Sequence, residues 1–191
     1  MSILLKDAAA LGLSFDDIWF NGWKHIEPFR KMLGARQGEQ FSQLIRQLKL
    51  PWNAWRDAGP VVLPQTGALP SCTLAGGLTL TLLSPSEAKL AALAEGWEKA
   101  IAALGKTPGA DEFLGGRVTL TDSTDVEALA DAPFTTDGAA ANGSSIAVLA
   151  EFAGKQVLLG ADAHAPLLVE YIQRLAGAGS TLALDAFKLP H

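Results

Sequence analysis

The feature that most constrains the fold is a strand–strand–helix succession near the end of the chain. Residues 145–152 and 155–160 are two apolar runs of strand length, and only Ala153-Gly154 separates them. A connection this short joins antiparallel neighbours in a hairpin. The chain then passes through residues 162–164 into a helical pattern opened by Pro166, which suits the first turn of a helix. Near the start of the chain, a strand-like run at 18–20 follows a helical pattern over 1–13, and this order favours an α/β fold over an all-helical bundle.

A second strand-to-helix unit lies upstream. Residues 78–83 alternate leucine with threonine, which is the pattern of a half-buried strand. Ser84, Pro85 and Glu87 follow in the spacing of a capping box, with Ser84 as the cap and Pro85 as the first helical residue. The predicted helix then carries one apolar stripe, formed by Leu90, Leu93, Trp97, Ile101 and Leu104.

The first sixty residues alternate predicted helices with short apolar runs. Residues 1–13 and 38–48 have helical spacing, whereas 18–20 and 60–63 suit short strands. Four of the five tryptophans lie before residue 56. These rings could line a binding face, but core packing is the favoured interpretation.

The stretch 105–143 has a different character, because Gly, Ala, Asp and Thr dominate it. Core-like runs resume after it, and a strand over 181–189 follows at the end of the chain. We therefore interpret 105–143 as a variable surface excursion within a single domain spanning 1–191. A chain of 191 residues is long enough for one sizeable core.

Composition restricts the partners of the chain. Hydrophobic residues make up 49% and charged residues 18%, a composition that argues against a disordered chain. The formal net charge of -5 gives no general attraction to phosphate backbones, so charge does not support nucleic-acid binding. No signal peptide and no apolar run of about 20 residues is evident, so we expect a cytoplasmic protein with no membrane partner. The single cysteine, Cys72, excludes an internal disulfide and a cysteine-based zinc site.

Candidate chemistry centres on Asp162. A carboxylate just past a buried strand is held on a rigid scaffold and can face a cleft, where a metal-bridging acid is useful. An Asp before a helix is also a common N-cap. The chain has three histidines, His25, His164 and His191. Asp162, His164 and His191 would converge if their two strands were neighbours in one sheet, but each histidine taken singly is read as a surface or hydrogen-bonded residue.

Four segments in order resemble the ComEC-like hydrolases of the metallo-β-lactamase fold. Residues 17–25, DIWFNGWKH, are similar to the strand and turn after the first helix of that family. Residues 142–146 and 158–164 resemble its Asn-x-Ser strand pair ending in Thr-Gly-Asp, and 184–191 resemble the strand before its His-His-Gly-Ser turn. The resemblance covers almost the whole chain. It implies an αββα sandwich with two metal ions, usually zinc, at one edge of the two sheets.

The same resemblance implies roles for individual residues. Asp162 corresponds to the catalytic aspartate that bridges the two metals, and His191 to the first histidine of the final turn. Asn142 and Ser144 correspond to a polar pair near the site, and His164 lies beside the aspartate. The expected function is zinc-type hydrolysis of a small-molecule or phosphoester substrate. The alternative is a non-catalytic remnant that acts as a protein-interaction module through its Trp-rich N-terminal face.

The chain also departs from the pattern of this family. The family's His-x-His-x-Asp-His motif precedes its first helix, whereas here that helix begins at Met1, and the chain stops at His191. The usual Thr-Gly-Asp stands as Gly160-Ala161-Asp162. We therefore expect a fragment truncated at both ends, with an incomplete zinc site and no activity as it stands. Open sheet edges in such a partial sandwich would favour self-association.

Overall fold

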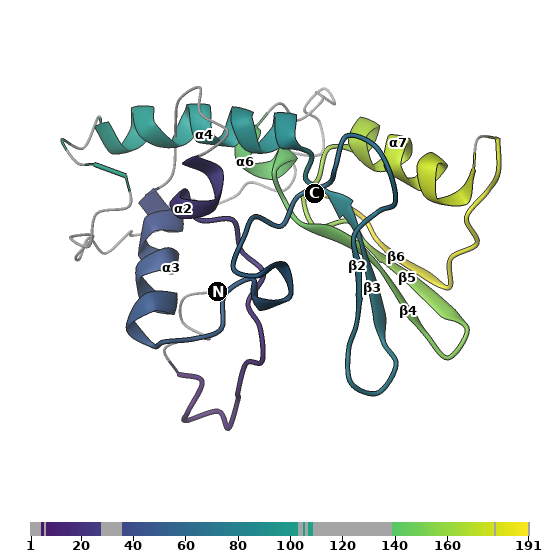
Figure 1. Cartoon of the computed structure of the whole chain (residues 1–191), viewed down its shortest axis with the longest axis horizontal. Coiled ribbons are helices and arrows are strands. Elements are labelled where there is room, and N and C mark those ends of the chain that lie inside the picture. The colour runs from purple at the N-terminus through teal and green to yellow at the C-terminus, as the bar shows by residue number, and fades with distance from the viewer. Residues whose placement is uncertain are drawn as a thin grey trace, which may run out of the picture.

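The computed structural model describes residues 5, 7–27, 36–102, 105, 107–108, 139–177 and 179–190. Helices and strands both occur, which confirms the predicted α/β class (Figure 1). The helical elements are α2 (Trp23–Ile26), α3 (Arg36–Gln47), the 3-10 helix η2 (Ala54–Arg56), α4 (Glu87–Ala102), α6 (Ala140–Gly143) and α7 (Ala165–Ala176). The strands are β2 (Ser71–Thr73), β3 (Thr79–Ser84), β4 (Ala147–Phe152), β5 (Lys155–Leu159) and β6 (Ala186–Lys188).

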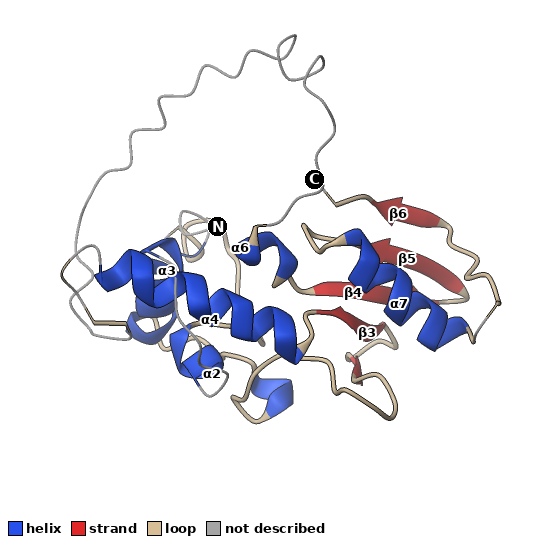
Figure 2. Ribbon diagram, turned by 90° about the horizontal axis from the view of Figure 1, so that it is seen from above, coloured by secondary structure: helices blue, strands red, loops and turns tan. Residues whose placement is uncertain are grey.

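The five strands form one mixed sheet in the order β2-β3-β4-β5-β6. The pairings from β2 to β5 are antiparallel, whereas β6 runs parallel to β5. A parallel pair needs a crossover connection, and here α7 supplies it. Figure 2 shows α7 lying across one face of the sheet. The β5-α7-β6 unit therefore adds a parallel strand and a covering helix to the antiparallel strands β2 to β5.

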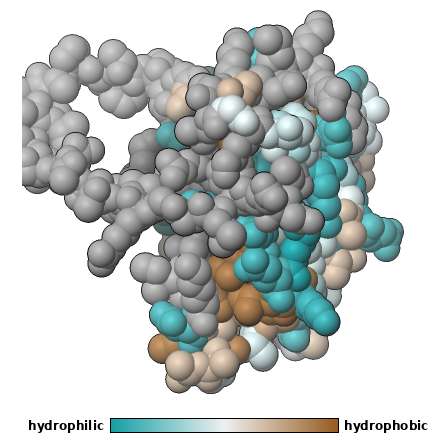
Figure 3. Space-filling view, turned by 90° about the vertical axis from the view of Figure 1, so that its left-hand side faces the viewer, coloured by the Kyte–Doolittle hydropathy of each residue, from teal (hydrophilic) through white to brown (hydrophobic). Residues whose placement is uncertain are grey.

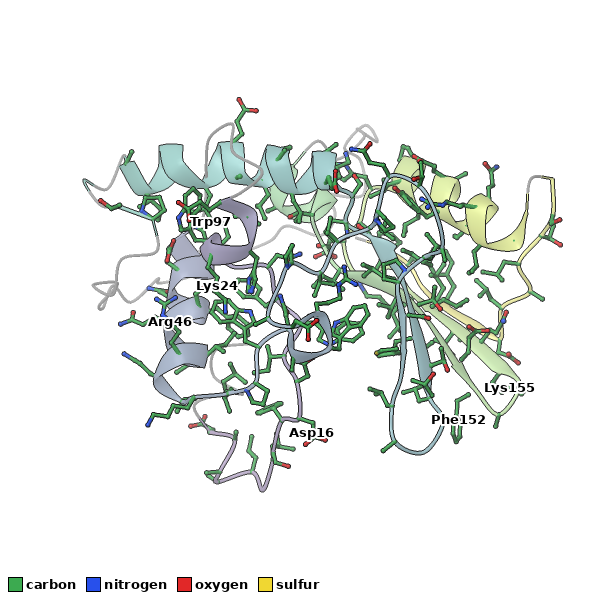
Figure 4. All side chains as sticks on the ribbon, viewed as in Figure 1. Asp16, Lys24, Arg46, Trp97, Phe152 and Lys155 are labelled. Carbon is green, nitrogen blue, oxygen red and sulfur yellow. The ribbon has the colours of Figure 1, made fainter. Side chains whose placement is uncertain are left out.

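The hairpin predicted between residues 145 and 160 is confirmed by β4 and β5. Its two connecting residues, Ala153 and Gly154, both have positive φ, at 49° and 75°. Two central residues with positive φ make a type I′ turn, whose twist matches the flanking strands. Phe152 pairs with Lys155 at the tip of this hairpin (Figure 4).

The two faces of the sheet are covered unequally. The register places Leu149 beside Leu158 on one face, and both are almost fully buried. Leu167, Leu168 and Tyr171 of α7 belong to the same core cluster. On the opposite face, Val148 pairs with Leu159, yet Leu159 remains 42% exposed. The second face is thus open toward the β6 edge.

A second core surrounds α2 and α4. The predicted stripe of α4 is confirmed, because Leu90, Leu93, Trp97 and Ile101 are buried in one cluster; Leu104 lies outside the described residues. Trp97 reaches from α4 toward α3 (Figure 4), and its Nε1 donates to Glu39 Oε1 at 2.8 Å.

Core packing also accounts for the other tryptophans. Trp23 and Trp52 are buried. Trp19 and Trp55 stack with their ring centroids 4.6 Å apart and pack against the core of the sheet. The end of the molecule seen in Figure 3 shows an apolar patch beside hydrophilic surface. Among the described residues before 56, the exposed large hydrophobic side chains are those of Leu11, Leu13 and Leu48 rather than tryptophans.

The short strands predicted at 18–20 and 60–63 are replaced by isolated bridges. Ile18 makes a bridge with Trp52, and Leu63 makes one with Ser86. Side chains take the place of strand partners here. The Asn21 carboxamide accepts from the Val61 N–H at 2.8 Å and donates to the Val61 carbonyl at 2.7 Å. The backbone groups a ladder would use are therefore already bonded.

The capping box predicted at Ser84 is wrong. Ser84 stays in β3, where it pairs with Ala147, so its backbone is not available for a helix. The helix α4 begins at Glu87, and the Lys89 N–H donates to Ser86 Oγ at 3.4 Å. The cap lies two residues later than the sequence suggested, because strand pairing continues through Ser84.

The two chain ends also differ from the predictions. Leu5 is helical, but residues 7–12 form turns and Leu13 belongs to no regular element, so the predicted helix does not extend to residue 13; residues 1–4 and 6 lie outside the described residues. The strand predicted over 181–189 is limited to β6. Just before β6, the Asp185 carboxylate accepts a hydrogen bond from the Gln156 N–H at 2.8 Å, so a side chain bonds the backbone that a longer strand would pair with. Of the predicted excursion at 105–143, only 105, 107–108 and 139–143 are described. Within the described residues, every helix is too short or too polar to cross a lipid bilayer.

Candidate functional site

Four strands have one terminus at the same end of the sheet. β3, β5 and β6 end there, and β4 begins there, because Val148 pairs with Leu159 and Leu159 with Lys188. The polar residues that these strand ends carry are the ones on which the candidate chemistry depends. We call them the strand-end site: Lys89, Asn142, Ser144, Asp162, His164 and Lys188.

Asp162 lies in the turn that follows β5. The Gly160 N–H donates to the Lys188 carbonyl at 3.0 Å, and a Cβ added at Gly160 would lie 3.0 Å from Pro190 Cδ. The segments after β5 and β6 are therefore in contact. The condition stated above, that the strands preceding Asp162 and His191 be neighbours, is met, although His191 lies outside the described residues.

The turn around Asp162 is held in an unusual backbone conformation. Ala161 has φ of +50°, which costs a non-glycine residue about 1–2 kcal/mol. The Lys188 ammonium donates to the Ala161 carbonyl at 2.9 Å and lies 4.0 Å from Asp162 Oδ1. The Asp162 side chain remains 40% exposed, so solvent reaches the carboxylate.

His164 occupies the N-cap position of α7. Its Nδ1 lies 2.8 Å from the Lys89 Nζ. An ammonium can only donate, so Nδ1 accepts and the ring proton is on Nε2. The ring also lies against the Gly143 backbone, because a Cβ added at Gly143 would come within 2.7 Å of His164 Cε1.

Asn142 and Ser144 flank that glycine. Asn142 belongs to α6, and Ser144 is the residue that ends it. The Ser144 hydroxyl donates to the Ala141 carbonyl at 2.7 Å, and the residue is nearly buried. The structure thus brings the 142–144 segment against His164, which is two residues from Asp162 in the chain.

The described residues do not by themselves fit a zinc centre. Zinc needs three or four convergent ligands, and an imidazole ligand must offer a lone pair. No group of three or more His, Cys, Asp or Glu side chains among the described residues could hold a metal ion. The Nδ1 lone pair of His164 faces the Lys89 ammonium, which leaves Asp162 as the one ligand that the described part of the site supplies.

Sequence reasoning missed three contributors to this end of the sheet: Lys89, Gly143 and Lys188. Lys89 lies 75 residues from His164 and looks like one of many charged helix positions. Gly143 was noted only as part of the segment between Asn142 and Ser144. No local pattern signals these contacts, because they exist only once the strands are aligned.

His25 lies apart from the strand-end site and is structural. Its Nδ1 accepts from the Gly22 N–H at 3.2 Å, and its Nε2–H donates to the Ala58 carbonyl at 3.1 Å. Burial first, and the nearby Lys24 charge second, lower the pKa of His25 to about 4. The neutral imidazole is thus part of the N-terminal core.

Comparison of the chain with protein-family models, with curated proteins and with solved structures gives no match.

Proposed function

We propose that this chain contributes to a cytoplasmic, metal-dependent hydrolase of the zinc type, built on an αββα sandwich of the metallo-β-lactamase kind. Asp162 is the metal ligand from the turn after β5, and His191 follows β6. The observation that carries the proposal is the parallel pairing of β5 with β6. This pairing brings the segments that follow β5 and β6, which lead to Asp162 and His191, to the same end of the sheet, where Gly160 lies close to Pro190.

A second observation supports the same proposal. In the pattern that the chain resembles, a glycine precedes the aspartate, and here Ala161 stands at that place. Its φ of +50° lies in the left-handed region that favours glycine. A glycine would adopt this backbone conformation without strain, which supports the correspondence of Ala161 to the glycine of the Thr-Gly-Asp pattern.

The chemistry of the site follows from its donor set. A bound zinc ion would polarise the scissile group and lower the pKa of a bound water. The Asp162 carboxylate would hold the ion, and it is exposed enough to receive one. Because the described residues supply one ligand, the remaining ligands lie outside them. The proposed substrate is a small-molecule ester or phosphoester.

The alternative of a non-catalytic interaction module has less support. It would use the Trp-rich N-terminal face, but Trp23, Trp52 and Trp97 are buried in the core. A partner could reach Trp19 and Trp55, yet these two rings are already stacked on each other and packed against the sheet.

The proposal is tested by metal binding to the full chain. Co²⁺ can stand in for Zn²⁺ and reports its ligands by visible absorption, so the titration is followed spectroscopically. We expect Asp162→Asn and His191→Gln each to weaken Co²⁺ binding at least about tenfold. Asp185→Asn is the matched control, since this carboxylate lies at the opposite end of β6. Equal Co²⁺ affinity in the wild-type chain and Asp162→Asn would refute the assignment.

A further inference from the structure

The contact between Lys89 and His164 joins two helices through one short hydrogen bond. Lys89 belongs to the first turn of α4, and His164 precedes α7. Their side chains meet at 2.8 Å. The imidazole also lies on Gly143, at the end of α6. A single ring is therefore held by three helical segments that are far apart in the sequence.

We propose that Lys89 is a positioning residue for Asp162. Its ammonium holds His164 in the Nε2–H tautomer and fixes the end of the turn that carries the carboxylate. The tautomer follows from the donor-only chemistry of the ammonium and needs no metal. The consequence for metal binding rests on the proposed function.

The turn is held at both ends by lysines. At its start, Lys188 donates to the Ala161 carbonyl at 2.9 Å. At its end, Lys89 donates to the His164 ring. Asp162 lies between these two anchors. A left-handed Ala161 persists only where the surroundings impose it, so loss of either anchor lets the turn relax and redirects the carboxylate.

Gly143 allows the imidazole ring of His164 to occupy this position. A Cβ at this residue would lie 2.7 to 3.0 Å from three atoms of the imidazole. Real Cβ contacts are not that short, so the ring and the α6 backbone can approach this closely only with glycine at 143. Lys89 fixes the direction of the ring, and Gly143 makes room for it.

The test compares Lys89→Met, which keeps the aliphatic stem, with Lys89→Arg, which keeps a cationic donor. Nitrogen-15 spectra of the full chain, at a pH where imidazoles are neutral, report the tautomer of His164, with His164→Gln used for assignment. We expect Nε2 to be protonated in the wild type and in Lys89→Arg. In Lys89→Met, we expect a mixture of both tautomers.

Co²⁺ titration of the same variants gives the second readout. Outer-shell substitutions typically cost 10- to 100-fold in metal affinity, so we expect at least about a tenfold loss for Lys89→Met and recovery in Lys89→Arg. If the wild-type chain binds no Co²⁺, the proposed function fails while the tautomer experiment still decides the role of Lys89.

Gly143→Ala provides an independent route if Lys89→Met does not fold. It should displace the ring and alter the His164 signals while Lys89 is intact. A wild-type His164 tautomer in a folded Lys89→Met, or unchanged His164 signals in Gly143→Ala, would overturn the proposal.

Discussion

At the scale of single residues, polar side chains in the N-terminal part bond backbone groups that strand partners would bond in a sheet. Asn53 accepts from the Phe20 N–H at 2.9 Å and is fully buried. Asp17 Oδ1 accepts from the Ala54 N–H at 2.7 Å, and Asp17 Oδ2 from the Trp19 indole at 2.9 Å. The Asn53 side chain would cost about 1–3 kcal/mol if it were buried without a partner, whereas the Asp17 bonds lie in half-buried or exposed positions. The 17–25 segment is therefore shaped by specific side chains rather than by strand propensity.

His25 makes this part of the protein sensitive to acid. Its neutral ring both accepts and donates a hydrogen bond, and burial lowers its pKa from 6.5 to about 4. Between these two pH values the unfolded chain binds more protons than the folded one, so the free energy of unfolding falls as the pH falls. The contribution is complete above pH 6.5 and lost by about pH 4, and it amounts to about 3 kcal/mol.

Urea unfolding of the wild type and of His25→Gln from pH 7 to pH 4 measures this contribution. We expect the wild-type free energy of unfolding to decrease more steeply than that of His25→Gln over the range. Parallel curves for the two proteins would show that His25 is not the acid-sensitive group.

At the scale of elements, the sequence predicts what depends on neighbours in the chain. The α4 stripe and the β4–β5 hairpin follow from local periodicity and a two-residue turn, and both are found. The 18–20 and 60–63 runs had strand-like composition, yet Asn21 bonds the backbone of Val61. No propensity rule foresees a side chain that competes with a ladder 40 residues away.

In the candidate site, too, the sequence predicts features that depend on neighbouring residues but not the long-range contacts. The place of Asp162 after a strand could be read from the sequence, and so could its possible meeting with the segment of His191. The lysines that hold its turn could not be found, because Lys89 reaches His164 only through the alignment of β3, β4 and β5. Contacts of this kind depend on register, which one sequence does not reveal.

The start of α4 gives a prediction at this scale. Ser86 Oγ caps the helix by accepting from Lys89 N–H, whereas Ser84 Oγ is buried with no hydrogen-bond partner among the described residues. Ser86→Ala should therefore lower the free energy of unfolding by about 0.5–1 kcal/mol. Ser84→Ala should leave it unchanged or raise it, because it removes an unsatisfied polar group.

Thermal unfolding of the two variants separates these outcomes, and each serves as the control for the other. A larger loss of stability in Ser84→Ala than in Ser86→Ala would show that Ser84, and not Ser86, caps α4.

At the scale of the whole molecule, the β6 side of the sheet is exposed. β6 is an edge strand with no partner on its outer side among the described residues, and all three of its residues are exposed. Phe187 on this strand is 44% exposed. An exposed apolar edge strand is a template for pairing with another chain. Self-association through this edge stays a prediction of the fold.

Sedimentation velocity over a range of concentrations tests this prediction. We expect the wild type to form dimers or larger species as concentration rises, and Phe187→Lys to shift the population toward monomer. Phe152→Lys is the matched control, because Phe152 is 54% exposed at the tip of the hairpin and not on an edge strand. A wild type that is monomeric throughout, or an equal effect of both variants, would contradict edge pairing.

The strand order also sets a sequence of events during folding. The β2–β3 and β4–β5 pairs are hairpins closed by short turns, and such units form within about 1–10 μs. The β3–β4 pairing joins them across the long connection that carries α4 and α6, so we expect it to be the slower, non-local step of folding. Lys89 follows the first hairpin, whereas Asp162 and His164 follow the second. A chain arrested before the two hairpins dock would hold these three residues without the geometry that makes them a site.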